Sequence, residues 1–194
     1  MISVSQNPGP SAWNELLPER EPLPCLSSNL TSDWLIVGAG FAGLSAARRV
    51  QQEAPNDSIV ILDAQGLAFG PAGRNSGFMI DLPHDLASDD YGGQIENDRE
   101  TITQNRCAIN FARETVEALQ LPKECFKEIG KINGAATAKG MRHNHDYAKH
   151  LSKLGEKYEY LDANSMKDIT GTNYYKGGLF TPGTVMIQPA LYVR

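Results

Sequence analysis

The chain has 194 residues, of which 41% are hydrophobic and 21% charged, and its formal net charge at pH 7 is −5. This acidic balance argues against a nucleic-acid-binding surface. The sequence contains no apolar run of about 18 residues, the length of a membrane-spanning helix, and no signal peptide. Its three cysteines, Cys25, Cys107 and Cys125, are odd in number, which is consistent with reduced thiols. We therefore expect a cytoplasmic globular protein with no nucleic-acid or membrane partner.

The first thirty residues contain five prolines, which favours an extended arm. We expect Trp13, Leu16 and Leu17 to order this arm against the body of the protein.

Three glycines follow the apolar run Leu35–Val37, which suits a buried parallel strand. Gly38 permits a tight turn, Gly40 allows backbone N–H groups to approach a phosphate, and Gly43 lets the next helix lie against the strand. The spacing predicts that helix over residues 41–53, and its N-terminus supplies the partial positive charge that an anion needs. The turn is typical of a dinucleotide site.

The predicted helix is amphipathic. Its apolar face carries Leu44, Ala47 and Val50, and its polar face carries Arg48, Arg49 and Gln52.

Asp63 ends a second predicted strand, residues 58–63, twenty residues after Gly43. A carboxylate at this position can accept hydrogen bonds from an adenosine ribose, and it disfavours the 2′-phosphate of NADP. Because strand, glycines, helix, strand and acid occur in this order, we favour a nucleotide site over a βαβ unit that binds no nucleotide.

A glycine-punctuated loop, residues 64–79, follows the second strand. Arg74 could offset phosphate charge, and Asn75, Ser76 and backbone amides could bind a polar ring system. The alternative is an ordinary surface loop, because turns use the same residue types.

Three segments of this region resemble a known family: Val37–Ala47, Leu62–Ala64 and Phe69–Phe78. They are similar to FAD-dependent oxidoreductases of the D-amino-acid oxidase superfamily, in particular the branch of gamma-glutamylputrescine oxidase. The resemblance implies FAD as the cofactor. It also implies a set of cofactor-binding residues: Gly38, Gly40, Phe41, Ala42, Gly43, Asp63, Ala64, Arg74, Asn75, Ser76, Gly77 and Met79.

The sequence departs from the family pattern in two places. Asp63 stands where glutamate is commoner, and Pro71-Ala72 stands where a small pair with serine is usual. Some relatives link the flavin to a histidine in this loop, but Arg74 holds the matching place, so no such link is expected.

The remaining elements alternate between helices and short strands. We predict a helix over 97–121, strand-like residues over 126–137 with a hairpin turn at Asn133-Gly134, helices over 142–155 and 162–169, short strands over 174–187, and a helix beginning at Pro189.

The fold class is therefore α/β, with a Rossmann-type FAD-binding βαβ unit, an incomplete parallel sheet and part of an α+β substrate domain. We assign residues 1–30 to the arm, 31–95 and 185–194 to the incomplete FAD-binding domain, and 96–184 to the partial substrate or cap domain. Because further parallel strands are lacking, we interpret the chain as an amino-terminal fragment of a longer flavoenzyme.

No catalytic residue is assigned. His143, His145 and His150 lack acidic or cysteine partners at ligand spacing, so we expect a solvated helix surface and no metal. His84 and Asp85 follow the loop and could approach a substrate, but surface roles are commoner for such residues. Met79 could face the flavin or pack in the core.

The function that follows is FAD-dependent oxidation of an amine or amino acid, with hydride transfer to the flavin. This fragment would bind FAD weakly and turn over poorly, and its partners would be the small amine substrate and the missing C-terminal half. The alternatives are a fragment of an NAD-dependent dehydrogenase and a non-catalytic degenerate fragment.

Overall fold

The computed structural model describes residues 9–83 and 95–194. The chain forms two compact units: Met1–Gly77 with Gln188–Arg194, and Phe78–Ile187. The predicted domains divide the chain instead at residues 95 and 185, so residues 78–95 and 185–187, which the prediction assigns to the FAD-binding domain, fall in the second unit. Their assignment to a cofactor or substrate domain stays a prediction.

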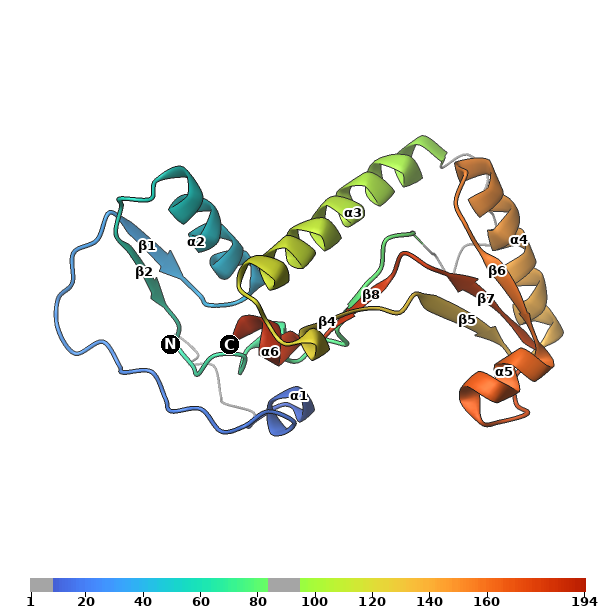
Figure 1. The fold of residues 1–194 in the computed structure, drawn as a ribbon, viewed down its shortest axis with the longest axis horizontal. Coiled ribbons are helices and arrows are strands. Elements are labelled where there is room, and N and C mark those ends of the chain that lie inside the picture. Colours follow the sequence, from blue (N-terminus) through green and yellow to red (C-terminus); the bar gives the residue numbers. More distant parts are fainter. Residues whose placement is uncertain (1–8, 84–94) are drawn as a thin grey trace, which may run out of the picture. The chain divides into compact units, whose positions relative to one another are not determined.

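The first unit is built around a βαβ arrangement (Figure 1). β1 (Trp34–Val37) and β2 (Ile59–Leu62) are parallel, with Trp34 opposite Ile59 and Val37 opposite Leu62. α2 (Phe41–Glu53) connects the two strands and packs against both. These elements confirm the predicted strand, helix and strand.

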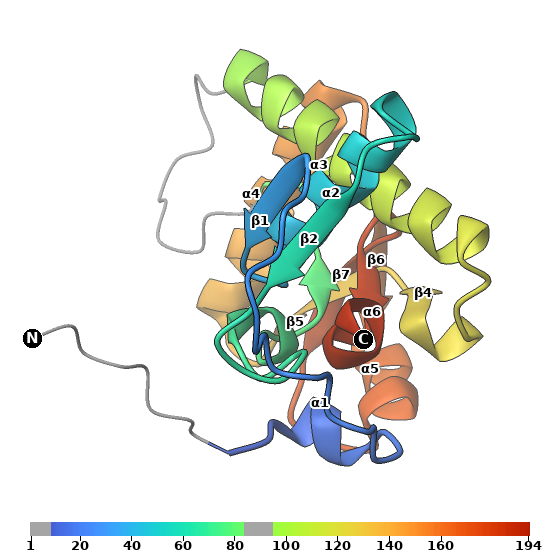
Figure 2. The same cartoon turned by 90° about the vertical axis from the view of Figure 1, so that its left-hand side faces the viewer.

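One face of β1 is uncovered in the described unit. The side chains of Leu35 and Val37 are 60% and 82% exposed, and Ile36 on the alternate face lies toward Gly43 of α2. Figure 2 shows β1 and β2 side by side. The apolar strand is therefore only half buried, although its composition predicts a fully buried one.

The chain's beginning and its last helix share a small core in this unit. α1 (Ala12–Glu15), the 3-10 turn η1 (Pro71–Gly73) and α6 (Pro189–Val193) meet there. Its buried residues are Ala68, Ala190 and Val193, against which Trp13 and Leu17 pack. Trp13 and Leu17 thus order the arm as expected, whereas Leu16 is 74% exposed.

The second unit contains two small antiparallel sheets. One has the strand order β3-β8-β4 and the other β5-β7-β6. Their strands are β3 (Phe78–Met79), β4 (Phe126–Glu128), β5 (Lys131–Ala135), β6 (Glu159–Asp162), β7 (Gly177–Thr181) and β8 (Val185–Ile187).

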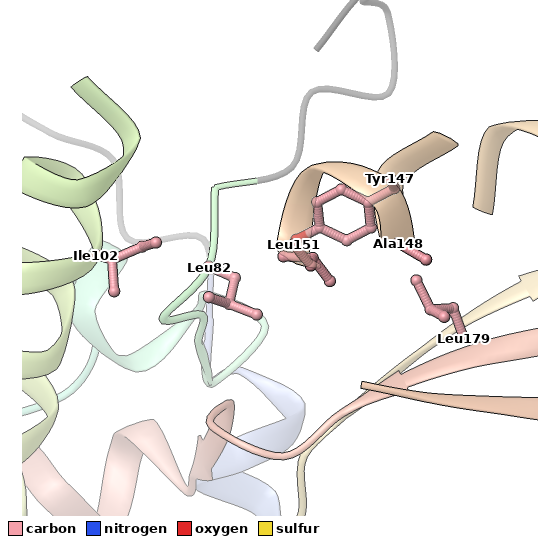
Figure 3. Close-up of a cluster of buried hydrophobic side chains, with 6 residues drawn as sticks. All are labelled: Leu82, Ile102, Tyr147, Ala148, Leu151 and Leu179. Atoms are coloured by element: carbon pink, nitrogen blue, oxygen red, sulfur yellow. The ribbon is translucent and has the colours of Figure 1, made fainter. Parts of the chain in front are cut away.

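Helices pack around these sheets. They are α3 (Ile95–Ala118), α4 (Ala138–Leu154) and α5 (Ala163–Thr170), with the short turn η2 (Lys123–Cys125) after α3. Six buried side chains form the core, from α3, α4, β7 and the segment after β3 (Figure 3): Leu82, Ile102, Tyr147, Ala148, Leu151 and Leu179.

The prediction of a hairpin turn at Asn133-Gly134 is wrong. Both residues lie inside β5, where Asn133 is opposite Leu179 and Gly134 is opposite Gly178 of β7. A Cβ on Gly134 would lie 2.7 Å from the Tyr175 ring. The glycine therefore leaves room for the Tyr175 ring beside β5. Pairing with β7 overrides the local turn preference of Asn133-Gly134.

Helix boundaries also differ from those predicted. α4 begins four residues earlier than predicted because the Thr137 hydroxyl accepts a hydrogen bond from the Gly140 amide (3.1 Å) and caps the helix. α3 ends at Ala118 rather than at residue 121. Within the described chain, no helix has the length and apolar character that crossing a bilayer requires.

Candidate functional site: a glycine turn at the start of the first long helix

The turn between β1 and α2 has the backbone that its glycines permit. Gly38 has φ +103°, a conformation that side chains disfavour, and its N–H donates to the Leu62 carbonyl (2.6 Å). A Cβ on Gly43 would lie 1.9 Å from the Gly38 carbonyl oxygen. Gly43 therefore allows the close approach of α2 to β1.

The first turn of α2 presents unused backbone donors. Gly40 is the N-cap and provides no side-chain cap, and the first bond of the helix runs from the Leu44 amide to the Gly40 carbonyl (3.0 Å). No described residue accepts a hydrogen bond from the amides of Phe41, Ala42 or Gly43. These three N–H groups and the helix dipole can together bind an anion.

Gly40 keeps the approach to these amides open. A Cβ placed on it would touch only the Ala72 Cβ of η1, at 3.6 Å. The fold therefore brings the loop after β2 beside the glycine turn. The predicted phosphate site and the predicted loop are neighbours.

Asp63 is tied to the glycine turn. Its Oδ2 accepts from the Ala39 amide (2.7 Å) and its Oδ1 from the Gln65 amide (2.9 Å). A carboxylate has about four acceptor sites. The exposed Asp63 thus braces the turn and still has acceptor capacity for ribose hydroxyls.

Arg74 and Asn75 hold the loop's own backbone. The Arg74 guanidinium donates to the carbonyls of Phe69 (2.7 Å) and Gly9. The Asn75 amide donates to the Ala72 carbonyl (2.8 Å), and its oxygen accepts from the Gly77 amide (2.8 Å). The structure therefore shows both side chains fixing the loop, and their contact with a cofactor stays a prediction.

The remaining predicted site residues differ in position. Ser76 and Ala64 are exposed, and Gly77 is buried with φ +79°. Met79 belongs to the second unit, where it is half-buried in β3 opposite Val185 of β8.

Besides the bond from Arg74 to the Gly9 carbonyl, the N-terminal arm makes three further hydrogen bonds to this loop, whose partners the sequence did not indicate. Ser11 Oγ donates to the Gly73 carbonyl (2.7 Å), Trp13 Nε1 to the Asn75 carbonyl (2.8 Å), and Asn14 Nδ2 to the Ala68 carbonyl (3.0 Å). The available signals were Trp13, which was expected to order the arm, and Ser11, which caps α1.

The other titratable candidates do not gather into a second centre in the described chain. The expected solvated surface is wrong for His150, which is buried with its Nε2 2.6 Å from Asp98 Oδ2 because α4 packs against α3 there. His145 is exposed beside Asp146, as expected. Burial raises the pKa of the Cys125 thiol to about 11, which keeps it un-ionised and unreactive. His84 and Asp85 lie outside the described residues.

Comparison with known proteins gives consistent matches. Gamma-glutamylputrescine oxidoreductase of Escherichia coli (strain K12) is 27% identical over 172 residues, which are 87% of this chain and 39% of that protein. Two solved structures share the fold. Glycine oxidase from Geobacillus kaustophilus has a TM-score of 0.64 at 15% identity, over 84% of this chain and 42% of that one. L-amino acid deaminase from Proteus vulgaris has a TM-score of 0.63 at 17% identity, over 89% and 39%.

The chain thus spans about two fifths of the length of the relatives that it matches. Residues 33–194 match the family described as FAD dependent oxidoreductase (DAO). This range begins just before β1 and includes the whole glycine turn. The chain belongs to the DAO family of FAD-dependent oxidoreductases.

Proposed function

We propose that the whole protein oxidises the C–N bond of a small amine or amino acid, and that this chain holds its FAD by the pyrophosphate. The observation that carries the proposal is the set of three unused amides, from Phe41, Ala42 and Gly43, at the start of α2. They lie next to the Asp63 carboxylate, which contacts the same turn through Ala39. The donors match a diphosphate and the acceptor matches a ribose.

When bound, FAD supplies an acceptor for the hydride from the C–H next to the substrate nitrogen. This chain's own residues bind and orient. The first turn of α2 would hold the pyrophosphate, and Asp63 the adenosine ribose. Arg74, Asn75 and Gly77 would keep the adjoining loop in shape, with Ser76 and Ala64 exposed at its surface.

Small nitrogen compounds are the substrates that we propose. The names of the matched proteins refer to gamma-glutamylputrescine, glycine and L-amino acids. Because the chain spans only about two fifths of such relatives, we propose that sequence outside it completes the substrate pocket. The chain alone would then bind FAD weakly and turn over poorly. Its three unpaired cysteines support a reducing, cytoplasmic location.

The test measures FAD binding to the chain by calorimetry, with FMN, which lacks the diphosphate bridge, as the comparison ligand. Gly40→Ala adds a methyl group where the diphosphate would approach, yet that methyl meets only Ala72 Cβ at ordinary contact distance. We expect this variant to bind FAD at least about tenfold more weakly, which is a loss of about 1.4 kcal/mol of binding free energy. Its melting temperature should be unchanged. Gln51→Ala, at the exposed far end of α2, is the control.

Gly43→Ala is a second variant, which tests the stability of the glycine turn and not its access to a ligand. Its added Cβ would meet the Gly38 carbonyl, so we expect it to lower the free energy of unfolding by about 1–3 kcal/mol. Equal FAD affinity in the wild type and in Gly40→Ala, or FMN binding as tight as FAD binding, would contradict the proposed pyrophosphate site.

A further inference from the structure

The second unit contains a cavity of about 790 Å³ that the cofactor proposal does not use. It lies between the first half of α4, β5 and the segment after β3. Lys131 of β5 points to the α4 side of the sheet, because its Nζ lies 5.9 Å from the centre of the Tyr147 ring of α4. The volume is within the range of about 300–1,000 Å³ that is usual for small-molecule sites.

The polar side of the cavity is basic. Lys131, Lys139 and His143 line it, and no aspartate or glutamate is among its described lining residues. Neither lysine forms an ion pair with a described carboxylate. The charge of Asp81 favours the protonated form of Lys131, but the Asp81 carboxylate is itself hydrogen-bonded to Arg106. Lys131 is half-buried, and this desolvation lowers the pKa of its ammonium group.

A buried donor lies beside these cations. Asn133 lines the cavity, and its Nδ2 is buried without an acceptor among the described residues. Asn144 Nδ2 donates to the Asn133 carbonyl (2.7 Å), which ties α4 to β5 at this point. A buried donor without a partner costs about 1–3 kcal/mol. A small rotation of the Asn133 side chain would turn this donor toward a ligand oxygen in the cavity and remove that cost.

Part of the cavity lining is apolar. Ile80, Leu82 and Pro83 line it. Leu82 is held in the core between α3 and α4, as Figure 3 shows, and is only 2% exposed. Apolar residues in one cavity with two lysines and an amide donor suit a molecule with one anionic end and a short hydrocarbon body.

We propose that this cavity binds a small aliphatic carboxylate, with its oxygens at Lys131 and Asn133 and its carbon chain against Ile80 and Leu82. The site lies wholly within the second unit, so it does not depend on the proposed pyrophosphate site.

The test titrates hexanoate into the ¹⁵N-labelled chain and follows amide chemical shifts by NMR. We expect shifts of the Gly134 and Gly140 backbone amides and of the Asn133 side-chain amide. Hexylamine and hexanamide have the same carbon chain without the negative charge, and should bind at least tenfold more weakly. Equal binding of hexylamine, or shifts confined to other parts of the chain, would overturn the proposal.

Variants assign the charge partner. Lys131→Met keeps the aliphatic stem and should weaken hexanoate binding about tenfold. Lys153→Met, on the exposed last turn of α4 and outside the cavity lining, should leave it unchanged. Lys139 is exposed, so Lys139→Gln should not affect folding. We expect this variant to bind hexanoate about threefold more weakly. If Lys131→Met fails to fold, unchanged hexanoate affinity in Lys139→Gln overturns the proposal on its own.

Discussion

At the scale of single residues, Asp81 has the most demanding environment in the second unit. Its side chain is 1% exposed, and its Oδ2 lies 3.0 Å from Arg106 Nη2. A Cβ on Gly183 would lie 1.9 Å from the same oxygen, so a glycine is required there. Arg106 also binds both Glu156 oxygens, at 3.0 and 2.5 Å. Glu156, followed by Asp81, raises the pKa of the Arg106 guanidinium, so this cation stays charged.

Arg106→Met should lower the free energy of unfolding by about 3 kcal/mol, because it leaves a buried carboxylate without its cation. The matched control is Arg113→Met on the same helix. Arg113 pairs with Glu128 at 2.6 Å, but the two side chains are 36% and 59% exposed, so we expect a loss of at most about 1 kcal/mol. Urea unfolding of both variants measures the difference. Equal losses would show that burial of Asp81 does not set the strength of the pair.

Sequence reasoning identified single residues where the backbone alone decides their role. The spacing of Gly38 and Gly43 predicts a tight turn and a close helix approach. The turn has φ +103° at Gly38, and a Cβ on Gly43 would clash with the strand end. The spacing could not show that Asp63 accepts from the Ala39 amide, or that Arg74 donates to carbonyls of its own loop and of the arm. Those bonds depend on how distant segments meet, which local patterns do not encode.

At the scale of elements, three helix ends that an aspartate or a glycine marks were predicted well. Asp162 caps α5 through the Ser165 amide (2.8 Å), and Gly155 and Gly171 end α4 and α5 in the left-handed conformation. The start of α4 was missed because Gly140 in its first turn weakens the helix pattern. Asn133-Gly134 was misassigned because its turn preference is local, whereas its pairing partner lies more than forty residues away in β7.

The end of α4 offers a stability test at this scale. Gly155 has φ +80°, and a Cβ there would touch nothing within 4 Å, so Gly155→Ala changes backbone strain without a clash. We expect a loss of about 1 kcal/mol in the free energy of unfolding. Gly155→Asn should lose less, since asparagine tolerates the left-handed region. Chemical unfolding of both variants gives the comparison, and an alanine variant as stable as wild type would refute the strain argument.

At the scale of the whole molecule, the first unit exposes apolar sheet. β1 pairs only with β2 among the described strands, and the face with Leu35 and Val37 is open. Parallel strands are normally covered on both faces, and an open apolar edge promotes association. The amphipathic pattern of residues 41–53 predicted an apolar face of α2 for packing against the sheet. It could not predict what covers the other face of the sheet.

Leu35→Lys should therefore reduce concentration-dependent self-association of the chain, as measured by light scattering after gel filtration. Leu30→Lys is the control, because Leu30 is equally exposed, at 62% against 60%, but lies outside the sheet. A lysine on the sheet face blocks stacking and edge pairing, and a lysine in the arm does not. If both variants change association equally, general charge rather than the sheet is responsible.

The shared core of α1, η1 and α6 has a consequence for how the protein is made. The loop from Ala68 to Asn75 is fastened by Ser11 and Trp13 near one end of the chain, and it packs against Ala190 and Val193 near the other. Gln188 also donates to the Trp13 carbonyl (2.9 Å). During translation, the ribosome must therefore synthesise the entire second unit before this loop can settle. A nascent chain would emerge with its glycine turn formed and the neighbouring loop still loose.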